Sequence, residues 1–121
     1  MQNMDFNVIF YDKPGGTFPA KDYLDSLDNK MFAKITRNIE VIEAGGTTVR
    51  EPYSKYLQDG IFEVRAQVSS NLARVLYFFF DGRRIILTHG FTKKTQKTPP
   101  AEIELAKKYR AEYLSREESK Q

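Results

Sequence analysis

Two arginines and a lysine pair are the residues of this chain best suited to chemistry on a phosphate group. Arg65 and Arg74 lie inside strand-like runs, and Lys93 and Lys94 end a third such run. Guanidinium and ammonium groups bind phosphate oxygens and neutralise the charge that develops on them during a reaction. The pattern therefore favours phosphate binding, although Glu63 offers the arginines a purely structural ion pair as the alternative.

Cleavage of RNA by its own 2′-hydroxyl is one reaction that such cations support without a metal. It needs a base for the hydroxyl proton, cations for the crowded phosphorane and an acid for the leaving oxygen. An amine close to other cations loses its proton more easily, so a lysine can also act as base or acid. Phe91 and His89 are further RNA-binding candidates, Phe91 by stacking on a base. Structural packing is the alternative for both residues.

Other chemistries find little support in the sequence. The chain has no cysteine and a single histidine, which excludes disulfides and thiolate zinc sites. We find no carboxylate pair suited to a two-metal nuclease, and Gly15-Gly16 lacks the Lys-Ser/Thr of a phosphate-binding loop. We therefore expect no metal and no cofactor. With no apolar run near the roughly 20 residues that span a bilayer, we also expect a cytoplasmic protein without a membrane partner.

The positive charge of the chain is concentrated in its middle. The formal net charge is +3, and residues 47–100 hold nine basic and four acidic side chains. The segments on either side of this stretch are balanced or slightly acidic. A fold that gathers the excess on one face would form a patch for a phosphate backbone or for an acidic protein partner.

The elements that must position these residues follow from periodicity. The length of 121 residues predicts a single domain spanning residues 1–121. Alternating hydrophobic residues predict a first strand, and helical spacing predicts two consecutive helices and a final one that Thr98 caps. Three further runs predict an antiparallel meander. The expected elements are a strand at 5–11, helices at 19–27 and 29–44, a loop at 47–58, strands at 61–68, 72–80 and 85–93, and a helix after 98–100 with a frayed tail at 115–121.

This order predicts an α+β fold in which a small antiparallel sheet packs on the N-terminal helical hairpin. If both turns of the meander have two or four residues, the parity of the strands assigns each side chain to a face. One face is then apolar and contacts the hairpin. The other face has a charged end, which we expect to stay open as a basic cleft, and an apolar end under the C-terminal helix. The expected charged end holds Glu63, Arg65, Arg74, His89 and Lys93, and the expected apolar end holds Leu76, Phe78, Ile85 and Leu87.

The central motifs resemble those of the RelE/ParE superfamily. They are GIFEVR (60–65), RVLYF (74–78), DGRRIILTHGFTKK (81–94) and TQKTP (95–99). Their order and spacing are most similar to the HigB-like branch, also described as phage-derived toxin-like proteins. The resemblance implies a RelE-like fold for nearly the whole chain.

The resemblance also implies an activity and partners. It implies the toxin of a type II toxin–antitoxin system, an endoribonuclease that cuts mRNA on the ribosome and inhibits translation. A helix-turn-helix, HigA-like antitoxin would neutralise it, and a heterotetramer is one assembly that this pairing allows. Carried over position by position, the implied catalytic residues are Arg65, Arg74, Lys93 and Lys94, the implied RNA-binding residues include Lys55 and Lys97, and Glu63 has a supporting role.

The resemblance leaves two alternatives open. ParE-like relatives share the fold but inhibit DNA gyrase by binding, and an inactive remnant would only bind its antitoxin. A tyrosine near the chain end is implicated as base in the RelE pattern, whereas this chain has a lysine pair and a helix in that region. If Arg65, Arg74 and Lys93 are catalytic, removing one should abolish toxicity without loss of stability. If the arginines form a structural pair with Glu63, removing one should destabilise the protein.

Overall fold

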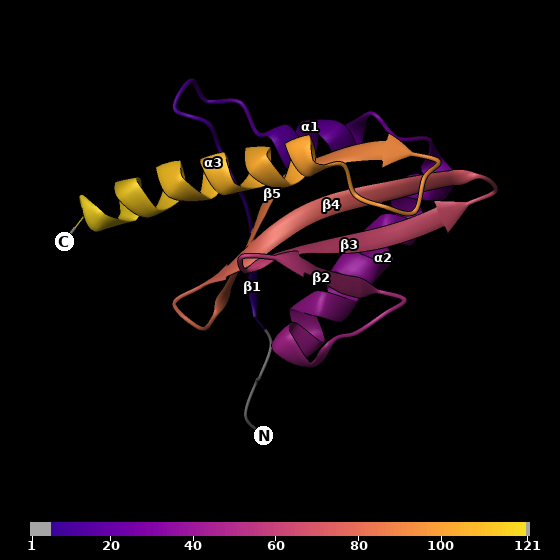
Figure 1. Cartoon of the computed structure of the whole chain (residues 1–121), viewed down its shortest axis with the longest axis horizontal. Coiled ribbons are helices and arrows are strands. Elements are labelled where there is room, and N and C mark those ends of the chain that lie inside the picture. Colours follow the sequence, from indigo (N-terminus) through magenta and orange to yellow (C-terminus); the bar gives the residue numbers. More distant parts are fainter. Residues whose placement is uncertain (1–5, 121) are drawn as a thin grey trace.

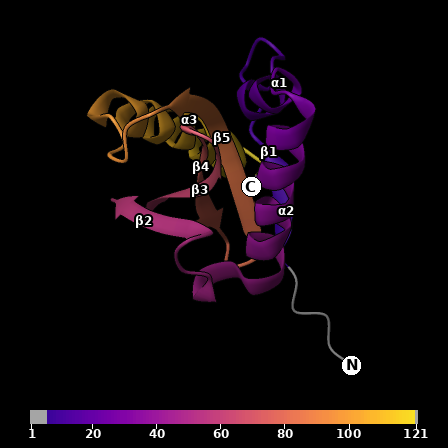
Figure 2. The ribbon, with the colours of Figure 1, turned by 90° about the vertical axis from the view of Figure 1, so that its right-hand side faces the viewer.

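Five strands form one mixed sheet, and helices cover both of its faces (Figure 1). The structure is a computed structural model and describes residues 6–120. The strand order is β1-β5-β4-β3-β2, with α1 and α2 on one face and α3 on the other (Figure 2). None of the described helices is long and apolar enough to cross a membrane. The elements are β1 (Asn7–Phe10), α1 (Pro19–Asp25), α2 (Asn29–Gly45), a 3-10 turn (Gly46–Thr48), β2 (Ser54–Gln58), β3 (Ile61–Val68), β4 (Asn71–Phe80), β5 (Arg84–Lys93) and α3 (Pro100–Glu118).

The helical hairpin is confirmed, and local signals define both ends of α2. The side chain of Asp28 accepts a hydrogen bond from the Met31 amide at 2.9 Å, which satisfies one of the free donors of the first turn. The helix stops where Gly46 adopts φ +54°, a conformation that favours glycine. A Cβ atom at Gly46 would also overlap the ring of Phe6. The glycine therefore both ends the helix and leaves room for the ring of Phe6, the residue just before β1.

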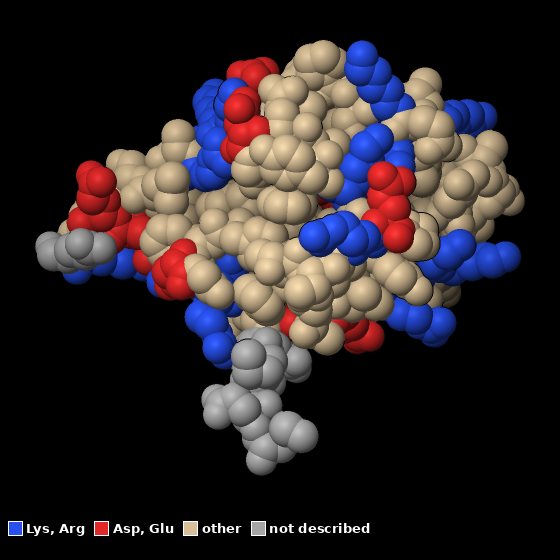
Figure 3. All heavy atoms as spheres, turned by 60° about the horizontal axis from the view of Figure 1, so that its bottom comes forward, with Lys and Arg blue, Asp and Glu red and all other residues tan. Residues whose placement is uncertain are grey.

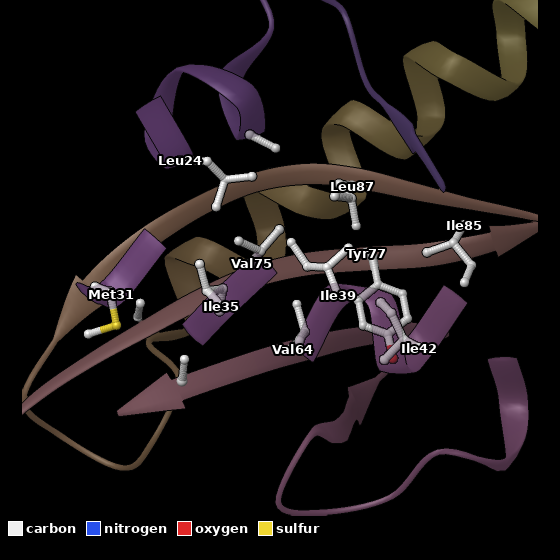
Figure 4. Close-up of a cluster of buried hydrophobic side chains, with 13 residues drawn as sticks. Leu24, Met31, Ile35, Ile39, Ile42, Val64, Val75, Tyr77, Ile85 and Leu87 are labelled. Carbon is white, nitrogen blue, oxygen red and sulfur yellow. The ribbon is translucent and has the colours of Figure 1, made fainter. Parts of the chain in front are cut away.

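The main core lies between this hairpin and the sheet (Figure 4). Ile35 and Ile42 of α2 are fully buried against Val64 and Val75 of the central strands. They lie at helical spacing on one side of α2, as the sequence predicts. A second cluster fills the space between the opposite face of the sheet and α3, where Leu76, Phe78, Ile86, Ala106 and Tyr113 are buried.

The β3–β4 hairpin has the expected parity. Val68 pairs with Asn71, so the turn contains two residues, and Val64 pairs with Val75. The apolar face of both strands therefore contacts the helical hairpin, as predicted. The same register places Arg65 directly opposite Arg74.

The β4–β5 hairpin differs from the prediction at one end. Phe80 pairs with Arg84, so this turn has three residues, and Ile85 and Leu87 consequently lie in the core under the helical hairpin. Their expected place beneath α3 is wrong. Thr88 is an extra residue, because Leu76 pairs with His89 and Tyr77 pairs with Leu87. This β-bulge reverses the parity again, so His89 still shares the face of Arg74.

The sheet itself is larger than expected and is not purely antiparallel. β1 pairs in parallel with β5, from Asn7 opposite Arg84 to Phe10 opposite Leu87. The segment expected to be a loop at 47–58 contains an edge strand, β2, which pairs antiparallel with β3. The first difference is a pairing between segments far apart in the sequence, and the second is a strand of only five residues.

The start and end of α3 also differ from the prediction. Thr98 does not cap the helix, since its hydroxyl donates to Glu63 Oε1 at 2.6 Å and Pro99 occupies the cap position. The helix continues to Glu118, so most of the tail expected to be frayed is helical. Residue 121, the end of that tail, and Asp5, the start of the first expected strand, lie outside the described residues.

Candidate nucleic-acid interface

Arg65 and Arg74 share one buried carboxylate, that of Glu63. The Nε atom of Arg65 lies 2.8 Å from Glu63 Oε2, and the Nε atom of Arg74 lies 4.0 Å from the same oxygen. The side chains of Glu63 and Arg74 are fully buried, whereas 12% of the Arg65 side chain is exposed. Two guanidinium charges against one carboxylate leave a local excess of one positive charge.

The loop between β5 and α3 covers both arginines. Arg74 donates hydrogen bonds to the carbonyls of Thr95 and Lys97, and Arg65 Nη2 donates to the carbonyl of Gln96 at 2.6 Å. Two guanidinium groups thus hold three consecutive carbonyl oxygens. The conformation of this lysine-bearing loop is therefore set by the two strand arginines.

Because the loop covers the arginines, the charged end of the sheet is less open than the sequence predicts. The cleft predicted to be open does not expose Arg74, whose guanidinium lies under the loop and 5.6 Å from the centre of the Phe91 ring. Burial lowers the pKa of Arg74, the charge of Glu63 raises it and that of Arg65 lowers it further. For Arg74 the geometry matches the alternative of a structural ion pair with Glu63. Arg65 is the more exposed of the two arginines.

The lysines of this region lie at or near the surface, without carboxylate partners in the part of the chain that the structure describes. Lys93, Lys94 and Lys97 are exposed, and Lys55 on the edge strand is half-buried. Among residues 6–120, none of these four forms an ion pair. Figure 3 shows one face of the molecule, on which groups of Lys and Arg side chains are spread over both halves with Asp and Glu side chains among them. The lysines that the sequence singles out therefore give an unneutralised surface around the loop.

His89 lies beneath α3 instead of at this surface. It is 5% exposed, and its Nε2 atom is 3.0 Å from Glu102 Oε1 while its Nδ1 atom is 3.2 Å from Thr88 Oγ1. Burial lowers the pKa of His89, and the Glu102 carboxylate opposes that shift. The structure does not bring this candidate RNA-binding residue to the lysine-bearing surface.

Phe91 occupies an intermediate position. Its half-buried ring lies next to the His89 ring, with centroids 6.3 Å apart and the ring planes inclined by 29°. The hydroxyl of Tyr23, from α1, donates to the Phe91 carbonyl at 3.0 Å and lies 2.5 Å from Thr92 Oγ1. Tyr23 packs directly over Gly90, where a Cβ atom would lie 2.2 Å from the Tyr23 ring. These contacts fix the end of β5, from which the lysine pair projects.

A hollow of about 360 Å³ lies beside Arg65, between α2 and the ends of β3 and β4. Its charged and aromatic lining includes Lys34, Arg65, Glu51 and Tyr53, and the Gln96 side chain of the loop borders it as well. Of these residues, Lys34 and Tyr53 were not among the candidates expected from the sequence. Lys34 and Tyr53 belong to segments read only as a helix and a loop, so no local signal placed them next to Arg65.

Within the described residues, no group of three or more His, Asp or Glu side chains is placed to hold a metal ion. The polar groups that the described residues place in this region are mainly guanidinium, ammonium and amide groups, together with the carboxylates of Glu63 and Glu51. The guanidinium and ammonium groups bind and neutralise anions, and all of these groups form hydrogen bonds.

Fold and site together define a small α+β protein with a cationic loop surface at one end of a mixed sheet, a fold compatible with the RelE type. The sequence matches the family described as phage-derived protein Gp49-like (DUF891) over residues 22–111. The chain belongs to this Gp49-like family, which is associated with RelE-type, toxin-like proteins. No curated protein matches the sequence significantly.

Proposed function

We propose that this chain is a HigB-like toxin of a type II toxin–antitoxin system, a metal-independent endoribonuclease that cuts mRNA on the ribosome. Family membership supports a toxin-like protein. The observation that carries the nuclease assignment is the set of unpaired lysines around the loop that Arg65 and Arg74 hold.

The loop lysines are grouped: Lys93, Lys94 and Lys97 lie within five positions of one another, and Lys55 and Lys97 line the same hollow. Among the other cations of residues 6–120, Lys107 and Arg116 on α3, Lys120 just after it and Arg84 on β5 each lie within 3.5 Å of a carboxylate oxygen. Lys13, Lys30 and Lys108 form no ion pair within these residues. The loop lysines have no such partners among the described residues. Unneutralised cations at one site attract a polyanion and are costly to the fold, which favours a role in binding.

The roles of the residues follow from their exposure. Arg65, Lys93 and Lys94 contact the scissile phosphate and neutralise its developing charge, and an amine of the lysine pair supplies proton transfer. Lys55 and Lys97 bind the flanking backbone. Arg74, being buried, is a positioning residue that holds the loop, and Glu63 orients both arginines.

The proposal includes the partners and location that accompany this activity. The ribosome presents the mRNA, because the site offers few candidate catalytic groups and needs its substrate held in place. A HigA-like, helix-turn-helix antitoxin neutralises the protein in the cytoplasm, and its acidic groups complement the lysine-bearing surface.

Induced expression in a bacterial host, with primer extension on cellular mRNA, tests the proposal. We expect growth arrest and new mRNA 5′ ends within translated regions. The variant Lys93→Ala/Lys94→Ala should lose both effects, while Lys21→Ala, which changes a lysine paired with Asp25 on α1, should keep them. Growth arrest with intact mRNA and a loss of negative supercoiling in plasmid DNA would instead indicate the gyrase-inhibiting alternative. Normal growth at a confirmed high level of folded protein would contradict any toxin.

A further inference from the structure

We infer that the hollow between α2 and the end of β3 binds one nucleotide of single-stranded RNA, with the base stacked on Tyr53. This inference rests on the proposed function in one respect, namely that the nucleotide belongs to RNA. Its volume of about 360 Å³ lies in the range of pockets that enclose small ligands. No residue of this hollow except Arg65 belongs to the set carried over from the family motifs.

The phosphate-binding part of the hollow is formed by Arg65 and Lys34. Arg65 uses Nε for Glu63 and Nη2 for Gln96, and its Nη1 group forms no hydrogen bond with any described residue. The Lys34 ammonium donates to the Gln67 carbonyl at 2.6 Å and makes no ion pair within residues 6–120. Arg65 shares the Glu63 carboxylate with Arg74, so the three cations Arg65, Arg74 and Lys34 face the two carboxylates Glu63 and Glu51. The remaining positive charge suits a phosphate group.

The base-binding part is formed by an aromatic ring and amides. Tyr53 is 42% exposed and lines the hollow, although large aromatic side chains usually bury more of their surface. Stacking on an exposed ring is the usual way in which proteins hold an unpaired base. Gln67 and Gln96 also line the hollow. Gln67 Nε2 donates to the Ser69 carbonyl and Gln96 Oε1 accepts from Arg65 Nη2, and each amide has further donors or acceptors for a base edge.

The position of this hollow relates it to the proposed cleavage surface. Arg65 borders both, and Gln96 belongs to the loop that carries Lys94 and Lys97. A nucleotide in the hollow would therefore adjoin a phosphate held by the loop lysines. The base in the hollow then contributes to the sequence preference of cleavage.

Titration of the isotope-labelled protein with nucleoside 5′-monophosphates, followed by NMR, tests this site without a ribosome. Ribose 5-phosphate and inorganic phosphate serve as probes that lack the base. We expect at least one of the four monophosphates to bind about tenfold or more tightly than ribose 5-phosphate, with shifts at Tyr53. Tyr53→Leu should abolish that difference, and Tyr53→Phe should keep it.

Tyr56→Leu provides the matched control, because Tyr56 is 55% exposed on the same segment but does not line this hollow. Equal binding of the monophosphates and ribose 5-phosphate, or no effect of Tyr53→Leu, would overturn the inference and leave at most a phosphate site. Absence of binding would also overturn it. Base-dependent binding in a protein that fails to cut translated mRNA would sustain this site and reject the proposed nuclease activity.

Discussion

Replacing Arg74 by alanine should destabilise the protein strongly. The substitution removes two hydrogen bonds to loop carbonyls, the contact with the Phe91 ring and one of the two cations beside the buried Glu63 carboxylate. Removing one member of a buried ion pair costs about 3–5 kcal/mol. Arg65 remains 2.8 Å from Glu63, so part of the compensation persists. We therefore expect the free energy of unfolding to fall by about 3 kcal/mol, the lower end of that range.

Urea unfolding followed by circular dichroism measures this change. Lys93→Ala is the control, since Lys93 is exposed, and it should stay within about 0.5 kcal/mol of the parent. Glu63→Gln combined with Arg74→Ala should not recover the loss, because Arg65 still pairs with Glu63 in the single variant and the second substitution breaks that ion pair. A loss below about 1 kcal/mol for Arg74→Ala, the net value of a single ordinary hydrogen bond, would refute the conclusion that this arginine holds the loop.

Three further predictions follow from the packing around β5. Gly90→Ala should lower the free energy of unfolding by about 1–3 kcal/mol, because the added Cβ would overlap Tyr23. Gly15 has open space around it, so Gly15→Ala should change this free energy by less than about 0.5 kcal/mol in the same urea assay. Burial lowers the pKa of His89, so below the ordinary histidine value of 6.5 the unfolded chain takes up a proton that the folded state resists. The free energy of unfolding should therefore fall as the pH drops below 6.5. A free energy of unfolding that does not change between about pH 5 and 7, or the same slope in His89→Gln, would contradict this. Tyr23→Phe removes the hydroxyl contacts with Phe91 and Thr92 and should cost about 1 kcal/mol, measurable by thermal melting, and an unchanged melting temperature would contradict that role.

Much of the fold was predictable because its signals are local. The isoleucines of α2 recur at helical spacing, and the two-residue turn after Val68 fixes the parity of β3 and β4. Hydrophobic periodicity and turn length act within a few residues, so a single sequence contains them. This is why Arg65 and Arg74 were predicted to share a face, and they do.

The remaining features depend on contacts between distant segments. The parallel pairing of β1 with β5 joins residues about 77 positions apart, such as Asn7 and Arg84, and no local pattern specifies it. β2 has five residues at the edge of the sheet, too short to show clear alternation. The bulge at Thr88 compensates for the three-residue turn, so His89 lies on the predicted face while Ile85 and Leu87 do not.

The sequence predicts which residues belong to the candidate site better than it predicts how they are arranged. The sequence indicates which cations gather at one end of the sheet, but not that the loop carbonyls would cover Arg74. It also gives no sign that Lys34 and Tyr53 would border Arg65. Such features arise from side-chain packing across three elements, which periodicity does not encode.

Primer extension on one mRNA in a reconstituted translation reaction, with and without ribosomes, tests the central claim most directly. We expect cuts in the translated mRNA when the purified protein is added. We expect none in the same RNA without ribosomes, and none with the Lys93→Ala/Lys94→Ala variant. Efficient cutting of naked RNA that EDTA abolishes, or an uncut mRNA under translation, would contradict it.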